Sequence, residues 1–490
     1  MSERVQDNRT HQDGEPPPSG QKPQRSLAPR DVEAMAEELR AYHALFHDLF
    51  GRREQREWSE FYLRGQLYGL ERKTIEPMVL ALKGADWAAV RAVQQFLGEG
   101  AWKDDPILWR LQGLIGEDLG EQDGMVLLDG SGFPKQGTHS VGVARQYCGL
   151  LGKVANCQHG VFAAYASRKG HAFLDRRLYL PEEWFDEAHA PLRKRYGVPE
   201  DLVFTTEPQL GLGMVQGLLE RRKVPFLWVL ADETYGADPK FLGGVEALGK
   251  WYFLEVPVTT RVWVGSVAIE PPGKGPMGRP RKYARVAEGT PKPREMRAIA
   301  SDLPARAWRC YPIKEGAKGT IEAEFAFVRV TRSMRRGKPG AAAWAVFRRG
   351  TGEEAPLKVF LTNAPESLGK HELAQVSGMR WPIETAFEEA KGEVGMDHYE
   401  VRTWRGWHHH MTQTLLAYHF LVQMRLKYKK SPSADLAAGE AAAGGNSVRR
   451  SAHARTRHRN RPVSAAAELC GLSITSRLHR DQAQKTSKAA

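Results

Sequence analysis

The hydrophobic positions divide the chain into regions with different periodicities. From residue 27 to about 120, apolar residues recur at helical spacing, as in Met35, Leu39 and Tyr42, and predict a series of helices. From Met125 onward, short apolar runs with few charges replace this spacing and predict buried strands. The pattern therefore predicts an all-α N-terminal segment followed by an α/β region.

Two of the short apolar runs end in an acidic residue. Residues 125–129 end in Asp129, before a predicted turn at 130–134, and residues 226–231 are followed by Asp232. A ribonuclease-H-like core has three or more strands, followed in order by a helix, a strand, a helix and a strand. In this fold the first and fourth strands are adjacent, so the acids at their ends converge. The other predicted elements of this region are strands at 141–147, 156–166, 172–180 and 252–258, and helices at 209–222 and 239–249.

A mostly β insertion is predicted before the last helices. Its strands are expected at 321–330, 341–347 and 357–362, and a helix at 415–426 closes the core. The predicted fold class is thus an α/β protein whose ribonuclease-H-like core is interrupted by this insertion. The expected divisions are a disordered tail (1–26), a helical domain for which DNA binding and a structural role are both open (27–120), the first part of the core (121–259), the insertion (260–368), the last part of the core (369–428) and a flexible basic tail (429–490).

A third acid begins the helix predicted from Pro382. Its apolar stripe starts with Ile383 and Phe387, and Glu384 and Lys391 lie within about 20° of each other on its surface. Arg380 stands just before the helix. A carboxylate between two cations suits a metal site next to a phosphate backbone.

Asp129, Asp232 and Glu384 are the candidate catalytic residues and metal ligands. Phosphodiester cleavage is promoted by two divalent ions, and Mg²⁺ (or Mn²⁺) prefers carboxylate oxygens. Each acid also has a structural alternative, since Asp129 suits a turn and Asp232 a helix cap. Neighbouring acids compete for the same roles: Glu233, Glu388 and Glu389.

The segment from Arg380 to Lys391, R-W-x-I-E-x-x-F-x-x-x-K, resembles the signature around the final glutamate of DDE transposases from bacterial insertion sequences. Residues 129–147 and 228–236 resemble the DDE superfamily endonuclease branch, and the resemblance extends from about 27 to 428. It implies cleavage and strand transfer of DNA ends, with Arg380 and Lys391 contacting the DNA. The family's tyrosine three residues before the arginine is replaced by Ser377.

The net charge of +13 favours a polyanionic partner, although part of the excess lies in the C-terminal tail. Lys135 and Arg145 suit phosphate contacts or simply flank strands. Arg279 and Arg281, in the sequence G-R-P-R-K, suit the minor groove of DNA or a solvated loop. The expected partner is double-stranded DNA, bound by a homodimer at the paired ends.

Cysteine usage and hydropathy indicate a reduced, cytoplasmic protein with no membrane segment. The four cysteines lack zinc-site spacing, and no apolar run reaches membrane-spanning length. Trp308 and Trp344 suit core packing or base stacking, and the histidines at 408–410 cannot all face one ion. Two rival functions stay open: a non-catalytic DNA-binding regulator, and a ribonuclease-H-like nuclease acting on RNA or hybrids.

Overall fold

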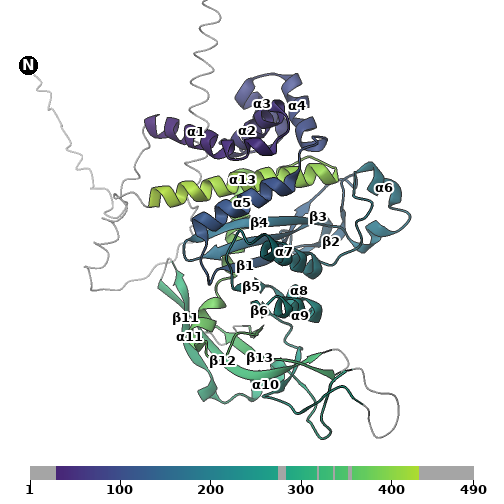
Figure 1. Cartoon of the computed structure of the whole chain (residues 1–490), viewed down its shortest axis with the longest axis vertical. Coiled ribbons are helices and arrows are strands. Elements are labelled where there is room, and N and C mark those ends of the chain that lie inside the picture. Colours follow the sequence, from purple (N-terminus) through teal and green to yellow (C-terminus); the bar gives the residue numbers. More distant parts are fainter. Residues whose placement is uncertain (1–28, 274–282, 317–318, 335–336, 351–355, 430–490) are drawn as a thin grey trace, which may run out of the picture.

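The computed structural model describes residues 29–273, 283–316, 319–334, 337–350 and 356–429 (Figure 1). These residues form a mixed α/β protein with a large mixed sheet that helices cover on both faces. The predicted N-terminal tail, the C-terminal tail from residue 430 onward, and Arg279 and Arg281 lie outside the described residues.

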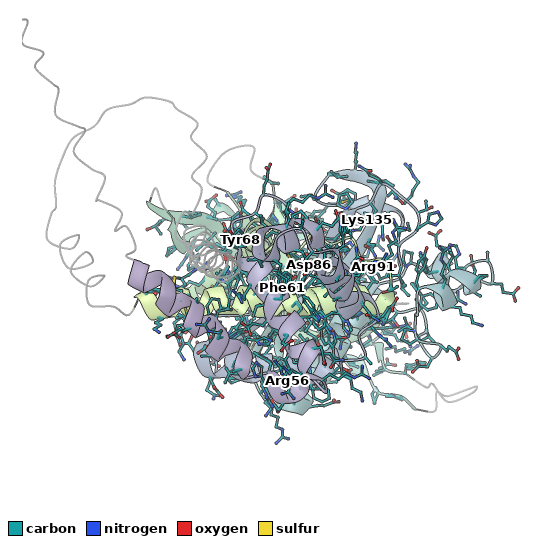
Figure 2. All side chains as sticks on the ribbon, turned by 90° about the horizontal axis from the view of Figure 1, so that it is seen from above. Arg56, Phe61, Tyr68, Asp86, Arg91 and Lys135 are labelled. Atoms are coloured by element: carbon teal, nitrogen blue, oxygen red, sulfur yellow. The ribbon has the colours of Figure 1, made fainter. Side chains whose placement is uncertain are left out.

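The predicted helices of the N-terminal segment are present. Asp86 begins one of them as its N-cap, because its side chain accepts a hydrogen bond from the Ala89 amide. Seen from above, these helices lie over the long helix α13 (Trp404–Lys429) (Figure 2). The helices are α1 (Pro29–Ala44), η1 (His47–Leu49), α2 (Arg53–Leu67), α3 (Ile75–Lys83), α4 (Trp87–Gly98) and α5 (Asp104–Leu119).

Helix α13 is the axis on which the N-terminal helices and the sheet both pack. It begins at Trp404, eleven residues before the helix predicted from 415, because buried polar side chains in its first half conceal the apolar periodicity. The Tyr62 hydroxyl is hydrogen-bonded to Nδ1 of His410 at 2.8 Å, and Nε2 of Gln66 donates a hydrogen bond to Oγ1 of Thr414 at 2.7 Å. Histidines 408, 409 and 410 are all buried, so His410 is packed and bonded within the protein.

Two parallel strand pairs form the centre of the sheet. Strand β1 (Met125–Pro134) pairs with β5 (Trp228–Ala231), and β5 pairs with β6 (Trp251–Glu255). The predicted adjacency of the strands associated with Asp129 and Asp232 is therefore confirmed. The predicted turn at 130–134 is wrong: β1 continues through it because β3 (Lys153–Ser167) pairs with β1 as far as Pro134.

The remaining elements around β1 follow the predicted order. Strand β3 also pairs with β2 (Ala144–Cys148) and β4 (Gly170–Tyr179), completing the antiparallel meander. Helices α5, α12 (Trp381–Val394) and α13 contact β4 on one side of the sheet, and α7 (Glu207–Arg221) contacts β1 and β3 on the other. The shorter connections contain η2 (Glu182–Phe185), α6 (Ala190–Arg195), α8 (Glu233–Gly236) and α9 (Pro239–Ala247).

Most of the inserted strands extend the main sheet, whereas the short strands at 269–270 and 285–286 pair with each other in a separate two-stranded sheet. Strand β14 (Lys358–Thr362) pairs with β6, and the sheet continues outward in the order β14, β13, β12, β7, β10. These strands and the N-terminal helices lie at opposite ends of the molecule (Figure 1). The elements are β7 (Arg261–Val264), β8 (Ile269–Glu270), β9 (Arg285–Val286), β10 (Arg294–Glu295), α10 (Met296–Asp302), η3 (Ala305–Ala307), β11 (Arg309–Gly316), β12 (Gly319–Met334) and β13 (Lys338–Arg349).

The tryptophans of the insertion take part in packing. Trp308 and Trp344 are partly buried against the core, and the guanidinium groups of Arg349 and Arg329 lie over their rings at 4.2 and 4.9 Å. After the insertion, α11 (Lys370–Val376) leads into α12. Among the described residues, no helix is long and apolar enough to cross a membrane.

We predict that the stability of the fold falls as the pH drops below about 6.5. Burial lowers the pKa of His43, His408 and His410 to about 3, so the folded protein keeps them neutral where the unfolded chain binds protons. Each should cost about 1.4 kcal/mol of unfolding free energy per pH unit between 6.5 and 3. Urea unfolding at pH 8, 6.5 and 5 measures this loss.

The variant His410→Asn provides the control for that slope. Whatever it does to absolute stability, it removes one of the buried histidines whose pKa is lowered, and it should therefore reduce the pH dependence. An unfolding free energy that stays constant from pH 8 to 5 in the wild type would contradict the prediction.

Candidate functional site

The first two candidate acids lie where the central parallel pairing ends. The last paired residues are Leu128 and Ala231, and Asp129 and Asp232 are the next residue on each strand. Asp129 lies within β1 and accepts a hydrogen bond from the Gly130 amide, whereas Asp232 precedes α8 and caps it through the Thr234 amide. The capping role anticipated as an alternative for Asp232 is thus present, and it leaves the acid at the same edge of the sheet.

Helix α12 brings the third acid to this edge. Its apolar stripe is buried, with Phe387 packed edge-on against Phe162, the residue that pairs with Asp129 across the sheet. Glu384 therefore lies in the first turn of a helix that is held over β1. The predicted helix and its buried face are confirmed.

A single guanidinium group joins the acids. Arg380 donates from Nη1 to Oδ2 of Asp129 at 2.9 Å and from Nη2 to Oε1 of Glu384 at 2.5 Å. Burial raises the pKa of Asp232, and the charge of Arg380 opposes that rise. The residue predicted to contact DNA is here the counter-ion of Asp129 and Glu384.

Burial dominates the electrostatics of the site. It raises the pKa of Asp129 to about 6, with further increases from Asp232 and Glu384, although the nearby charge of Arg380 opposes them. Burial also raises the pKa of Asp232. Carboxylates that are costly to ionise without a partner are suited to binding cations.

The competing acids lie in different surroundings. Glu233 and Glu388 are exposed. Glu389 accepts hydrogen bonds from Tyr418 at 2.7 Å and Arg425 at 3.1 Å, which ties α12 to α13. The structure therefore gives Glu389 a packing role and brings Glu384 to Asp129.

The two candidate lysines lie on aromatic rings beyond the acids. Lys391 Nζ lies 5.7 Å from the ring centre of Phe133, and Lys135 (labelled in Figure 2) lies 3.6 Å from that of Tyr399. Burial lowers the pKa of both, that of Lys135 to about 8. Arg145 is exposed on β2.

Two residues not selected from the sequence lie beside Gly130, the residue that follows Asp129. Nε2 of His159, on β3, is 3.2 Å from Oε2 of Glu207, the first residue of α7. A side chain at Gly130 would overlap Nε2 of His159 and come within 3.4 Å of Glu207 Oε2. His159 and Glu207 are 48 positions apart in the chain. The sequence offered one indication of this pair, an acidic residue near the start of a predicted helix.

The geometry does not include a ready-made metal cage. Among the described residues, no three histidine, cysteine, aspartate or glutamate side chains are grouped closely enough to hold an ion. The guanidinium group of Arg380 lies between Asp129 and Glu384 instead. The donor set itself consists of carboxylate oxygens, which are the ligands that Mg²⁺ prefers.

The close approach of His159 to Gly130 gives a testable prediction. Gly130→Ala should destabilise the protein by about 1–3 kcal/mol, because the added methyl group overlaps an imidazole held by Glu207. The double variant Gly130→Ala/His159→Ala should recover part of this loss when unfolding free energies are compared. Additive effects of the two substitutions would contradict the proposed contact.

Comparison with known proteins identifies a family. A sequence model of the DDE superfamily endonucleases matches residues 45–320, which is more than half of the chain and includes Asp129 and Asp232. The match ends before Arg380 and Glu384, so their assignment depends on the geometry and the sequence pattern. No curated protein matches the chain. The chain belongs to the DDE superfamily endonucleases.

Proposed function

We propose that this endonuclease is a DNA transposase that cuts the ends of an insertion sequence and joins them to target DNA. Asp129, Asp232 and Glu384 would be its catalytic acids. The observation that carries this proposal is that Arg380 bridges Asp129 and Glu384 while Asp232 follows the strand paired with that of Asp129, although 103 residues separate the first two acids and 152 the last two. Such convergence has no evident purpose in a protein that only binds DNA.

The carboxylate oxygens fit divalent ions, and DDE superfamily nucleases generally use ions such as Mg²⁺. We infer that Asp129, Asp232 and Glu384 hold two Mg²⁺ or Mn²⁺ ions. Ions bound there would supply the positive charge that phosphodiester cleavage requires. Arg380 marks the position where the protein already accommodates positive charge between Asp129 and Glu384.

Arg380 would serve two partners in turn. In the DNA-free protein, its ion pairs with Asp129 and Glu384 offset the repulsion between these two acids. When divalent ions neutralise the acids, the guanidinium becomes available for a phosphate of the DNA end, for which its planar donors are well suited. Metal binding and DNA binding should therefore favour each other.

Lys391 and Lys135 would continue the phosphate-binding surface along β1. Their ammonium groups lie over aromatic rings, which limits the conformational entropy that a phosphate contact would cost. Arg145 on the neighbouring β2 would add a peripheral contact, and Arg279 and Arg281 remain candidates from the sequence alone.

The order of the central elements supports a ribonuclease-H-like core. Strand β1, the meander through β4, helix α7 and the parallel strands β5 and β6 follow that order. We also keep the proposed domain divisions. The helices from 29 to 119, however, share a hydrophobic core with α13 of the catalytic part. We further propose that two copies pair the DNA ends in the bacterial cytoplasm.

One observation favours a non-catalytic regulator as the alternative. Ser377, at the position of the family's tyrosine, is buried and donates a hydrogen bond to the carbonyl of Ala374. Its hydroxyl is therefore engaged within the protein and does not replace a DNA contact. A regulator of this origin would bind the element's ends without cutting them.

A cleavage assay with Mn²⁺ or Mg²⁺ and duplexes carrying the element's ends tests the function. Glu384→Gln should reduce nicking at least about 100-fold while DNA binding persists, because one carboxylate charge is lost from the site. The exposed Glu388→Gln, on the same helix, is the matched control and should retain activity.

The outcomes separate the candidates. Binding without nicking by the wild type would favour the regulator, and faster cleavage of an RNA–DNA hybrid of the same sequence would favour a ribonuclease. Equal nicking by the wild type and Glu384→Gln would mean that another acid completes the site.

The dual role of Arg380 gives a second prediction. Arg380→Ala should bind Mn²⁺ about tenfold more tightly in the absence of DNA, because the competing internal cation is removed. DNA affinity should fall, and the slope of its logarithm against the logarithm of salt concentration should decrease by about one. Calorimetric titration with Mn²⁺ and DNA-binding assays at several salt concentrations measure these effects.

Arg91→Ala, which removes an exposed arginine from α4, controls for the change in net charge. Unchanged Mn²⁺ affinity in Arg380→Ala would show that the guanidinium does not compete with divalent ions.

A further inference from the structure

The hairpin formed by β2 and β3 exposes an apolar tip. Residues 149–152 connect the two strands. Strand β3 begins at Lys153, but its pairing with β1 begins only at Cys157, so the end of the hairpin projects beyond β1. The large apolar side chains of the tip are about half exposed or more, and they are Tyr147 (64%), Leu150 (56%), Leu151 (45%) and Val154 (55%).

The four side chains of the apolar tip are grouped within residues 147–154. Tyr147 and Val154 are direct cross-strand partners, so their side chains stand on the same face of the hairpin. Leu150 and Leu151 follow Tyr147 in the connecting turn. Single exposed apolar residues are common on protein surfaces, whereas a group of them at a projecting tip indicates contact with a partner.

Tyr147 and Val154 stand on the same face of the sheet as Asp129. Asp129 pairs with Phe162 on β3, and β3 runs from Val154 to Phe162 without a register shift against β1 or β2. Side chains alternate along a strand, so Val154 and Phe162, an even number of positions apart, share a face. The apolar tip therefore belongs to the face that carries the candidate acids.

Contacts between the acids and the apolar tip follow this face. Gln158 of β3 accepts a hydrogen bond from the Tyr399 hydroxyl at 2.9 Å. The ring of Tyr399 packs edge-on against Phe133 of β1. The ammonium groups of Lys135 and Lys391 lie over the rings of Tyr399 and Phe133, respectively. Both candidate lysines thus lie along the surface that leads from the acids to the tip.

The chain around the apolar tip is basic. Residues 130–174 include five lysine or arginine residues and no aspartate or glutamate. Arg145 stands on the face of Tyr147, two positions before it on β2, and Lys153 flanks the tip on β3. Both cations are exposed. A cationic hairpin with an apolar tip complements a polyanion that also offers apolar surface, as the sugars and bases of DNA do.

The same charges argue against a second copy of the chain as the partner. A symmetric contact between two tips would bring Arg145 and Lys153 of one hairpin against the same residues of the other. Like charges brought together in this way oppose association. DNA has the opposite charge, and the surface that leads to the tip carries further cations.

We propose that the apolar tip inserts into the bound DNA duplex and unstacks base pairs near the cleaved end. The inference rests on the proposed function and adds a second contact with the same duplex. Tyr147 and Leu150 would contact the bases, while Arg145 and Lys153 would contact phosphates beside them. Proteins that insert apolar side chains between base pairs bend the duplex, and the bend increases its contact with the protein.

The strand geometry gives the position of this contact. The segment of β3 from Val154 to Phe162, the partner of Asp129, is about 25 Å long. A duplex that passes from Asp129 to the tip covers this distance with about seven base pairs. Unstacking is therefore expected about seven base pairs from the cleaved bond.

Full-length protein and end-bearing duplexes with a single 2-aminopurine test the inference without relying on cleavage. Wild-type binding should raise the fluorescence at least about twofold when the probe lies about seven base pairs from the boundary, because unstacking relieves its quenching. The double variant Tyr147→Ser/Leu150→Ser should abolish this rise. Val264→Ser, which removes an exposed apolar side chain from β7 of the insertion, should retain it.

The salt dependence of DNA affinity gives a second measurement. Tyr147→Ser/Leu150→Ser should bind about 5- to 10-fold more weakly, because contacts with bases are lost. The slope of log affinity against log salt concentration should stay unchanged, since no phosphate contact is removed. Arg145→Gln should instead decrease this slope by about one. Thermal unfolding verifies that each variant is folded.

The outcomes separate this inference from the proposed function. Wild-type affinity and an unchanged probe signal in Tyr147→Ser/Leu150→Ser would overturn the inference and leave the three-acid site intact. A DNA-free wild-type dimer that the double variant converts to a monomer would also overturn it, because the tip would then contact another copy. Failure of the wild type to bind any end-bearing duplex would overturn the proposed function as well.

Discussion

The parallel pairing of β1 with β5 is the constraint on which the candidate site depends. The two strands stop pairing at Leu128 and Ala231, so the next residues, Asp129 and Asp232, emerge together at an open edge of an otherwise buried sheet. The acids are separated by 103 positions in the chain, and only the crossover through α7 brings them together. The buried apolar stripe of α12 holds this helix over β1, and this brings Glu384 to the two aspartates.

The negative charge of the candidate acids is partly balanced by the guanidinium group of Arg380. Buried carboxylates repel one another and are poorly solvated, and burial raises the pKa of both aspartates. Arg380 offsets this cost in the DNA-free protein. In the proposed mechanism, the guanidinium that stabilises the site would compete with the divalent ions, and it would thereby link ion binding to DNA binding.

The distant parts of the chain support this edge through a shared core. Helix α13 contacts β4 on one side and the N-terminal helices on the other, and its buried histidines and threonines bond with residues such as Tyr62 and Gln66. The fold therefore couples the helical N-terminus to the sheet that carries the acids. Most of the inserted strands extend the same sheet at its other end, beyond β6.

The sequence by itself determined the strands that precede Asp129 and Asp232, their adjacency, and the helix that carries Glu384, because these depend on local periodicity and on element order. Tertiary structure decided the rest. Cross-strand pairing with β3 carried β1 through an expected turn, and buried polar contacts lengthened α13 beyond its apolar pattern. Two contacts could not be predicted: the ion pair of Arg380 with Asp129, and the contact of His159 with Glu207. Such contacts depend on which faces of distant segments pack together, and local sequence patterns do not contain this information.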